Sequence, residues 1–320
     1  MTIKDNIYGK YEVKEPVLLD ILKNPSINRL KRISQYGIPD KYYHFENYSR
    51  YEHSVGAMLL LRKLGATLEE QVAGLLHDVS VLAFSHIADW VFGDGPNGTE
   101  GYHNRIHAKF VKSTDIPKIL KKYGFRVERI LNEENYSLLE RNIPDLCADR
   151  VDYALREFKY WLNPKIVKEC LNSLVNYNGE IVFTDKGHAL DFANNYLELQ
   201  TQHWGGYESM IRYHLFSEMV KLALEEKIVA EKDFFEDEPF VLGKIEASKH
   251  KGIQEKLSLL KKRDLSSVKR ASGKKVFKKF RFVNPKVLVD GKLQRLTELT
   301  PGFKKVIEKH RKINLKGLMV

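Results

Sequence analysis

Two histidines and two aspartates constrain the fold most strongly, because together they suit one metal site although they lie far apart in the chain. They are His53, His77, Asp78 and Asp149. His77 and Asp78 are about 100° apart at the end of one predicted helix, 68–78, so both can grip the same ion. Two imidazoles and two carboxylates suit one divalent ion (Mn, Fe, Zn, Mg, Co or Ni) that activates water. The sequence therefore predicts a fold that brings three distant segments together.

The segments that carry these residues are predicted to be helices. His53 lies on predicted helix 51–64, which is followed by a break at Gly65-Ala66 and by Thr67, a predicted N-cap with Glu70 at the capping-box position. Asp149 belongs to predicted helix 145–160. If predicted helices 51–64 and 68–78 pack as an antiparallel pair, the imidazoles of His53 and His77 can meet. A single histidine such as His53 is more often a surface or core residue than a ligand, so the pattern as a whole carries the inference.

The rest of the chain predicts a mainly α fold with a smaller C-terminal α+β lobe. Further helices are expected at residues 17–36, 83–92, 102–112, 115–123, 186–203, 207–227 and 302–311. Asn178-Gly179 predicts a hairpin over 175–184, and residues 274–294 read as strands. We divide the chain into a helical core, residues 1–234, and a basic α+β lobe, residues 235–320.

Charge is distributed unevenly along the chain. Residues 249–320 hold 22 Lys and Arg against 5 Asp and Glu, whereas the remainder holds 31 against 37, and the net charge is +11. A mildly acidic body with a strongly basic C-terminal portion favours a polyanionic partner, such as a nucleic acid, nucleotide phosphates or an acidic surface. A solvated surface in a lysine-rich proteome is the alternative.

The two cysteines, Cys147 and Cys170, exclude a cysteine-based zinc site and argue against a structural disulfide. The N-terminal residues mix charges and contain no apolar signal region. The apolar stretch at 55–61 is too short to span a bilayer. We therefore expect a cytoplasmic protein with no membrane partner.

Four ordered blocks between Arg29 and Glu157 resemble the HD-domain phosphohydrolases. They are N-R-L-K-R-I-S-Q-Y-G at 28–37, S-R-Y-E-H-S-V-G at 49–56, L-L-H-D-V-S-V-L-A-F-S-H at 75–86 and A-D-R-V-D-Y at 148–153. Within that superfamily they are most similar to the deoxynucleoside triphosphate triphosphohydrolases. The resemblance implies an HD-domain helical catalytic core, with the metal motif within 50–157, that hydrolyses a dNTP to a deoxynucleoside and triphosphate.

The resemblance also implies roles for individual residues. The metal ligands would be His53, His77, Asp78 and Asp149; the catalytic residues His86, Asp89 and His103; and the substrate-binding residues Arg50, Arg150 and Tyr153. His86 and Asp89 are one helical turn apart, so a hydrogen bond between them is feasible. Taken alone, Arg50 could form a surface salt bridge and Tyr153 could be a core tyrosine.

The chain departs from the family pattern after His77-Asp78. Ser80-Val81 stand where the family has Gly-His, and that histidine helps to hold the substrate's phosphates, which valine cannot do. Two alternatives therefore stay open. One is an HD phosphohydrolase acting on another phosphoester or pyrophosphate. The other is a catalytically weak HD scaffold that binds nucleic acid through its basic lobe.

Expected partners follow from the same features. A nucleotide substrate is the first. A nucleic acid or a nucleotide activator at the basic lobe is the second, with Lys274, Lys275, Lys278 and Lys279 available to bind it. By analogy with the family we also expect a homo-oligomer.

Overall fold

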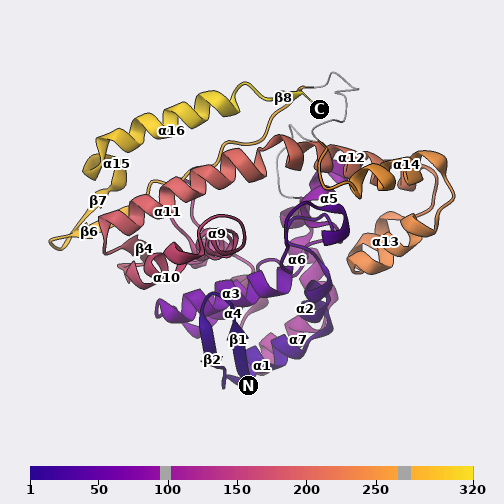
Figure 1. The fold of residues 1–320 in the computed structure, drawn as a ribbon. Helices are drawn as coiled ribbons and strands as arrows, with labels where there is room; N and C mark the ends of the chain where they lie inside the picture. Colours follow the sequence, from indigo (N-terminus) through magenta and orange to yellow (C-terminus); the bar gives the residue numbers. More distant parts are fainter. Residues whose placement is uncertain (94–101, 266–274, 320) are drawn as a thin grey trace.

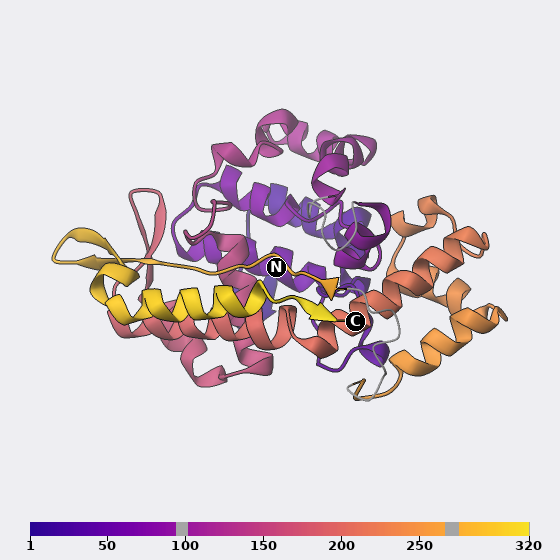
Figure 2. The same cartoon turned by 90° about the horizontal axis from the view of Figure 1, so that it is seen from above.

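The computed structural model describes residues 1–93, 102–265 and 275–319 and confirms a mainly α fold (Figures 1 and 2). The α-helices are α1 (Pro16–Lys23), α2 (Pro25–Arg29), α3 (Arg50–Lys63), α4 (Leu68–Leu76), α5 (Ser85–Phe92), α6 (Tyr102–Ser113), α7 (Ile116–Lys122), α8 (Val127–Ile130), α9 (Ala148–Trp161), α10 (Pro164–Ser173), α11 (Lys186–Glu198), α12 (Tyr207–Glu225), α13 (Glu238–Ala247), α14 (Lys251–Leu260), α15 (Leu296–Leu299) and α16 (Pro301–Asn314). Shorter helical turns are η1 (Leu30–Arg32), η2 (Asp40–Tyr42), η4 (Glu133–Asn135), η6 (Glu231–Phe235) and the π-helical η5 (Leu199–Trp204). The strands are β1 (Thr2–Asp5), β2 (Gly9–Glu12), β3 (Leu174–Tyr177), β4 (Glu180–Phe183), β5 (Lys275–Val276), β6 (Lys286–Val289), β7 (Lys292–Arg295) and β8 (Leu318–Met319).

Helix α9 lies at the centre of the molecule and is seen end-on in Figure 1, with α3 and α4 on one side of it and α11 on the other. Its Val151, Ala154, Leu155 and Phe158 are fully buried. Helix α3 is buried continuously from His53 to Leu61, as expected for a helix enclosed by neighbours rather than lying on a surface. The main hydrophobic core therefore surrounds the helices that carry the predicted metal ligands.

Two helix starts in this core show how local sequence sets the boundaries. Ser49 and Glu52 form a capping box at the start of α3, each side chain accepting from the other residue's backbone N–H. Thr67 caps α4 as predicted. The predicted role of Glu70 in that cap is wrong: its Oε1 instead accepts hydrogen bonds from the backbone of Leu138 and Leu139. Glu70 therefore ties α4 to the loop that leads to α9.

A second hydrophobic cluster surrounds α12, against which α5 and α14 pack. Phe84, Phe216 and Phe234 form part of it, with the Phe84 ring centroid 5.0 Å from that of Phe216 and 6.0 Å from that of Phe234. This cluster fixes the segment that enters α5, where the predicted catalytic residues lie.

The predicted hairpin at Asn178-Gly179 is confirmed: both residues have positive φ, 52° and 80°, as a type I′ turn requires. A similar turn at Asp290-Gly291 joins β6 to β7. Strand β4 pairs in parallel with β6, so the middle and the last parts of the chain share one sheet. This pairing links the two portions of the division predicted at residue 234, which stays a prediction.

The strands predicted over residues 274–294 are confirmed in part: β6 and β7 form a hairpin, but the first predicted strand is much shorter than expected. Within the described part, only Lys275–Val276 form a strand there, paired with β8, and residues 277–285 have no regular ladder. Both cysteines are buried and free. Among the described residues, no helix has the length and apolar character needed to cross a membrane.

Candidate metal centre and active-site cleft

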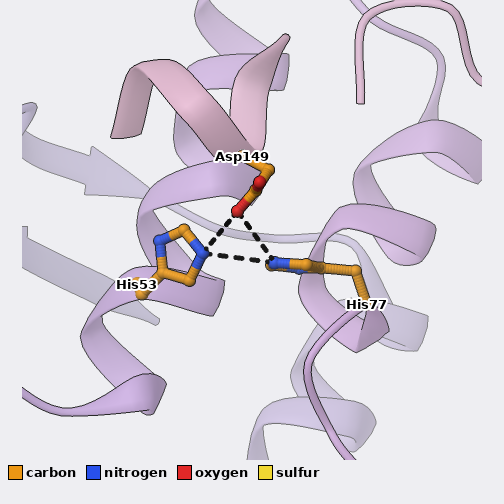
Figure 3. A group of neighbouring side chains, drawn as sticks. All are labelled: His53, His77 and Asp149. Carbon is orange, nitrogen blue, oxygen red and sulfur yellow. Dashed lines mark hydrogen bonds and ion pairs between the residues drawn. The ribbon is translucent and has the colours of Figure 1, made fainter. Parts of the chain in front are cut away.

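His53, His77 and Asp149 converge on one point (Figure 3). His53 lies in the first turn of α3, His77 at the C-terminal end of α4, and Asp149 in the first turn of α9. Asp149 Oδ1 is 2.9 Å from His53 Nε2 and 3.6 Å from His77 Nε2, and the two Nε2 atoms are 3.2 Å apart. Three segments that are distant in sequence thus contribute one ligand atom each.

These separations match the spacing of neighbouring ligands around a single divalent ion. With metal–ligand distances of ~2.1 Å, adjacent ligand atoms lie about 3.0 Å apart in octahedral and about 3.4 Å apart in tetrahedral geometry. Nitrogen and carboxylate donors together suit Zn, Mn, Fe, Co or Ni. The residues present therefore fit a divalent metal ion.

The outer nitrogens of both imidazoles make hydrogen bonds that orient the inner nitrogens. His77 Nδ1 donates to the carbonyl oxygen of Gly74 at 2.7 Å. His53 Nδ1 donates to Asp152 Oδ2 at 2.8 Å. Each Nδ1 carries a proton in these bonds, so Nε2, which faces Asp149, is the atom of each ring that would bind a metal ion once its own proton is displaced. Such outer partners are the usual means by which proteins orient histidine ligands.

Electrostatics also favour a cation at this point. Burial alone would lower the pKa of His77, but Asp78, Asp149 and the Gly74 carbonyl raise it to about 10. Burial alone would raise the pKa of Asp149, but His53 and His77 hold it well below the ordinary value. The centre therefore has a negative potential at the two Nε2 atoms that a bound divalent ion would neutralise.

A buried ionic network supports His53 from behind. Arg156 Nε donates to Asp152 Oδ2 at 2.9 Å, and Arg156 Nη2 donates to Asp5 Oδ2 of strand β1 at 2.8 Å. Asp152 and Arg156 are almost completely buried. Gly56 leaves room for the pair, because a Cβ there would lie 2.0 Å from Asp152 Oδ1 and 2.1 Å from Arg156 Nη2. The N-terminal hairpin is thereby connected to the metal centre through three charged residues.

Asp78, the fourth predicted ligand, lies slightly farther away. Its Oδ2 is 3.8 Å from His53 Nε2 and 3.7 Å from His77 Nε2, and it accepts a hydrogen bond from Arg50 Nη1 at 2.5 Å. Arg50 also donates to Ser85 Oγ and to the Gln35 carbonyl. Arg50 is therefore held against the ligand set from inside, with only 6% of its side chain exposed.

His86, the predicted general acid or base, lies next to Arg50. Arg50 Nη2 donates to His86 Nε2 at 3.0 Å, and His86 Nδ1 is 3.9 Å from Asp89 Oδ2, beyond hydrogen-bonding distance. Burial, Arg50 and Lys278 lower the pKa of His86 and outweigh Asp89, so the ring is neutral near pH 7. Asp89 Oδ1 accepts from the backbone N–H of Tyr102, which links α5 to the start of α6.

A strained turn aims His86 into the cleft. Phe84 and Ser85 both have positive φ, 64° and 41°, in the left-handed region that non-glycine residues rarely occupy. Gly37 packs against this turn so closely that a Cβ would lie 2.1 Å from the Phe84 carbonyl oxygen. The sequence blocks 28–37 and 75–86 thus contact each other where Gly37 packs against Phe84.

The other predicted site residues are distributed as follows. Arg150 donates to the carbonyl oxygens of Asp145 and Arg141, so its guanidinium is engaged with the chain although it lines the cleft. The Tyr153 hydroxyl is 2.6 Å from that of Tyr196, and Tyr153 also lines the cleft. The side chain of His103 lies outside the described residues.

A cleft of about 500 Å³ opens over the metal centre. Its lining contains Arg50, His77, Asp78, His86, Asp89, Asp149, Arg150 and Tyr153. Basic side chains from the C-terminal portion also line it, namely Lys278, Lys279 and Arg281. Tyr36, Glu157 and Trp204 line it as well, and burial raises the pKa of Glu157 to about 8 against the opposing hydrogen bonds from Tyr36 and Trp204. A protonated Glu157 can both donate and accept hydrogen bonds there.

Sequence reasoning missed several of these residues. Asp152 and Arg156 could have been found, because on predicted helix 145–160 Asp152 follows Asp149 by one turn and Arg156 follows Asp152 by another. Glu133 and Glu140, which line the cleft near Asp149, carry no local signal. Val81, which replaces the family histidine, is buried in the main core, with 2% exposure, and does not line the cleft.

Comparison with known proteins agrees with this geometry. A model of the HD domain matches residues 50–156. The chain is 38% identical over 264 residues to the uncharacterized protein YdhJ of Bacillus subtilis, covering 81% of this chain and 79% of that protein. It is 42% identical over 155 residues to the metal-dependent phosphohydrolase cns2 of Cordyceps militaris, covering 48% and 44% of the two chains.

More distant similarity extends to a deoxynucleoside triphosphate triphosphohydrolase, SAMHD1 of Bos taurus, at 35% identity over 107 residues, or 28% of this chain and 18% of that protein. A solved structure of a hypothetical protein from Aquifex aeolicus has the same fold, with a TM-score of 0.66 at 20% identity over 98% of this chain and 99% of that one. The geometry of the metal centre, the HD-domain match and the similarity over 264 residues all point to the same family. This chain belongs to the HD-domain family of metal-dependent phosphohydrolases.

Proposed function

We propose that the protein hydrolyses deoxynucleoside triphosphates to a deoxynucleoside and inorganic triphosphate. The observation that carries the proposal is the cleft itself. The cleft is lined by residues of the metal-ligand set, by Arg50 and His86, and by several further cationic side chains. Its volume of about 500 Å³ is typical of small-molecule sites. Similarity to a triphosphohydrolase over 107 residues supports the same substrate class.

The chemistry requires attack of water on the α-phosphorus. A P–O bond forms to the water oxygen, the P–O5′ bond breaks, and O5′ gains a proton. His53, His77, Asp78 and Asp149 would hold a divalent ion, which polarises phosphate oxygens and lowers the pKa of water. Arg50 lies beside this set and would stabilise negative charge that develops on the phosphoryl oxygens.

His86 is the residue suited to move the proton. Its low pKa keeps the ring neutral, so it can accept a proton from the attacking water and return it to O5′. The oxygen of the attacking water stays on the α-phosphorus and becomes part of the triphosphate product. Tyr36, Glu157 and Trp204, which also line the cleft and carry hydrogen-bonding groups, would contact the nucleoside, whose sugar hydroxyl and base both form hydrogen bonds.

Another phosphoester or pyrophosphate is the second candidate substrate. It is favoured by Val81, whose burial in the core leaves the cleft without the family histidine at that position. The same experiment separates the two candidates, because the products identify the cleaved bond.

The experiment incubates purified protein and Mn²⁺ with each dNTP and NTP and identifies products by ion-exchange chromatography. Asp149→Asn replaces a charged carboxylate ligand by a neutral amide, which binds a divalent ion more weakly. Asp115→Asn is the matched control, since its carboxylate is 71% exposed at the start of α7. Triphosphate released from a dNTP by the wild type and by D115N, but not by D149N, is the expected result. Release of phosphate or pyrophosphate would move the cleaved bond and refute the triphosphohydrolase proposal. Metal-bound protein that forms no product would refute dNTP hydrolysis.

A further inference from the structure

An extended basic segment contributes to the lining of the cleft. Residues 277–285 run beside α16 between two sheet attachments, the β5–β8 pair at one end and the β4–β6 pair at the other (Figure 2). Three of its side chains, Lys278, Lys279 and Arg281, line the cleft over the metal centre. We call these three residues the basic strap. The most basic part of the sequence thus contributes directly to the wall of the active-site cleft.

The backbone of the basic strap is held by two buried or half-buried amides. Gln200, which is 1% exposed in the π-helical turn η5, accepts from the N–H of Arg281 at 3.1 Å and donates to the carbonyl oxygen of Lys279 at 3.2 Å. Asn314 of α16 donates to the carbonyl oxygen of Lys278 at 2.8 Å. Gln200 also donates to Asn314 at 3.2 Å, so both anchors form one unit. The strap is therefore ordered before any substrate arrives.

Two phenylalanines of the segment pack against helix α16. The rings of Phe280 and Phe282 stack on each other at 5.7 Å, and both lie under the guanidinium of Arg311 on α16, at 5.0 and 5.2 Å. Arg281, which stands between the two phenylalanines in the sequence, lines the cleft. This packing explains why the segment is fixed without a β-ladder.

Lys278 and Arg281 lie near different groups of the cleft. The Lys278 ammonium lies 5.3 Å from the centre of the Tyr213 ring on α12, and it helps to lower the pKa of His86. Arg281 opposes the rise that burial causes in the pKa values of Tyr153 on α9 and Tyr196 on α11. The positive charge of the basic strap therefore acts on residues from several of the helices around the cleft.

We propose that the basic strap binds the phosphate chain of the substrate, so that Lys278 and Arg281 supply the cationic contacts that Val81 cannot make. The inference deepens the proposed function and rests on it for the identity of the substrate. The chemistry it names, a polyphosphate with several negative charges, is more general. An ammonium and a guanidinium recognise phosphate oxygens by charge-assisted hydrogen bonds. A cleft of about 500 Å³ suits a nucleotide rather than a nucleic-acid duplex.

The test uses the full-length protein loaded with Mn²⁺ and inorganic triphosphate as the probe. Binding is measured by isothermal titration calorimetry for the wild type, the double variant Lys278→Met/Arg281→Met and the control Lys304→Met/Lys305→Met. The control removes the same charge from exposed positions on α16. Methionine keeps the aliphatic stem, and equal thermal unfolding midpoints of the three proteins establish that the fold is retained. The charge-preserving variant Lys278→Arg provides a second comparison.

We expect the strap variant to bind triphosphate roughly tenfold to hundredfold more weakly per lost contact, because each contact is charge-assisted. The control should bind like the wild type, and Lys278→Arg should retain most of the affinity. If a dNTP is hydrolysed, the KM of the strap variant should rise by a similar factor.

Equal triphosphate affinity of the strap variant and the control would overturn the proposal, and so would a variant that loses only affinity for a single-stranded oligonucleotide. Loss of triphosphate binding in a protein that hydrolyses no dNTP would support the basic strap and refute the proposed substrate. If the wild type hydrolyses a dNTP, and the strap and control variants bind triphosphate equally well, the proposed substrate is supported and the role of the basic strap is refuted. The two proposals therefore fail separately.

Discussion

Replacing Asp152 by asparagine would isolate the charge that supports His53. Both donors, His53 Nδ1 at 2.8 Å and Arg156 Nε at 2.9 Å, meet the same oxygen, Oδ2. The other oxygen, Oδ1, is buried and has no hydrogen-bond partner among the described residues. An asparagine can therefore keep its carbonyl oxygen where both donors converge and place its amide group at the Oδ1 position. The substitution removes the negative charge and leaves both hydrogen bonds in place.

The expected magnitudes follow from this geometry. Loss of an outer partner of a metal-binding histidine typically weakens metal affinity 10–100-fold, and we expect the lower end, about tenfold, for Asp152→Asn, because His53 keeps its orientation. Asp152→Ala removes the oxygen that accepts both hydrogen bonds and should weaken metal affinity about 100-fold. It should also lower the free energy of unfolding by roughly 3–5 kcal/mol, because Arg156 then loses one of its two buried carboxylates.

The assay is calorimetric titration of each apoprotein with Mn²⁺, together with urea unfolding. Asp5→Asn is the matched control: it neutralises the carboxylate at the other end of Arg156, 2.8 Å from Nη2, without touching His53. We expect D5N to lose stability and keep its metal affinity, and D152N to lose metal affinity. If D152N binds Mn²⁺ as tightly as D5N does, the argument that Asp152 raises the ligand strength of His53 is refuted.

Two further predictions concern stability. Burial raises the pKa of Glu238 to about 7, against 4.5 for an ordinary glutamate, even though Ser34 opposes the rise, so the folded state holds a proton between about pH 4.5 and 7 that the unfolded state has released. Its contribution to the free energy of unfolding is present below about pH 4.5 and falls by roughly 3 kcal/mol as the pH rises to about 7. In urea unfolding measured across this pH range, the free energy of unfolding of Glu238→Gln should rise by that amount relative to the wild type. A difference between the two proteins that does not change with pH would contradict the assignment. Gly56→Ala should lower the free energy of unfolding by at least about 2 kcal/mol, because its Cβ would overlap Asp152, whereas Gly243→Ala, which meets nothing within 4 Å on α13, should raise it by about 0.5–1 kcal/mol. Equal effects of the two alanines on the urea midpoint would show that the space around Gly56 relaxes freely.

Features with a local cause were predictable from the sequence. The Asn178-Gly179 hairpin, the Thr67 cap and the helices around the HD motif depend on contacts within a few residues, and the structure confirms them. The convergence of His53, His77 and Asp149 was predictable for another reason: their residue types suit one ion, which is a constraint on distant positions.

Features that depend on distant packing were missed. Glu70 has the right position for a capping box, but the backbone N–H groups of Leu138 and Leu139 compete for its carboxylate, and no local pattern announces them. Residues 277–282 alternate like a strand, yet their partners are Gln200, Asn314 and Arg311 rather than a neighbouring strand. Alternating polar and apolar residues predict an extended backbone, but they do not predict whether a neighbouring strand supplies its hydrogen bonds.

The Ser80-Val81 departure illustrates how a lost motif residue can be offset from elsewhere in the chain. A histidine after His77-Asp78 would reach the phosphates from the same loop as the metal ligands. Here Val81 packs into the core, and the opening of the cleft is bordered by Lys278 and Arg281, about 200 residues later in the sequence. Coulombic attraction depends on distance in space, so a cation supplied by a strap across the cleft can act on the same phosphates as one supplied by the motif. If the basic strap binds phosphate as proposed, the basic character of residues 249–320 is in part a property of this cleft.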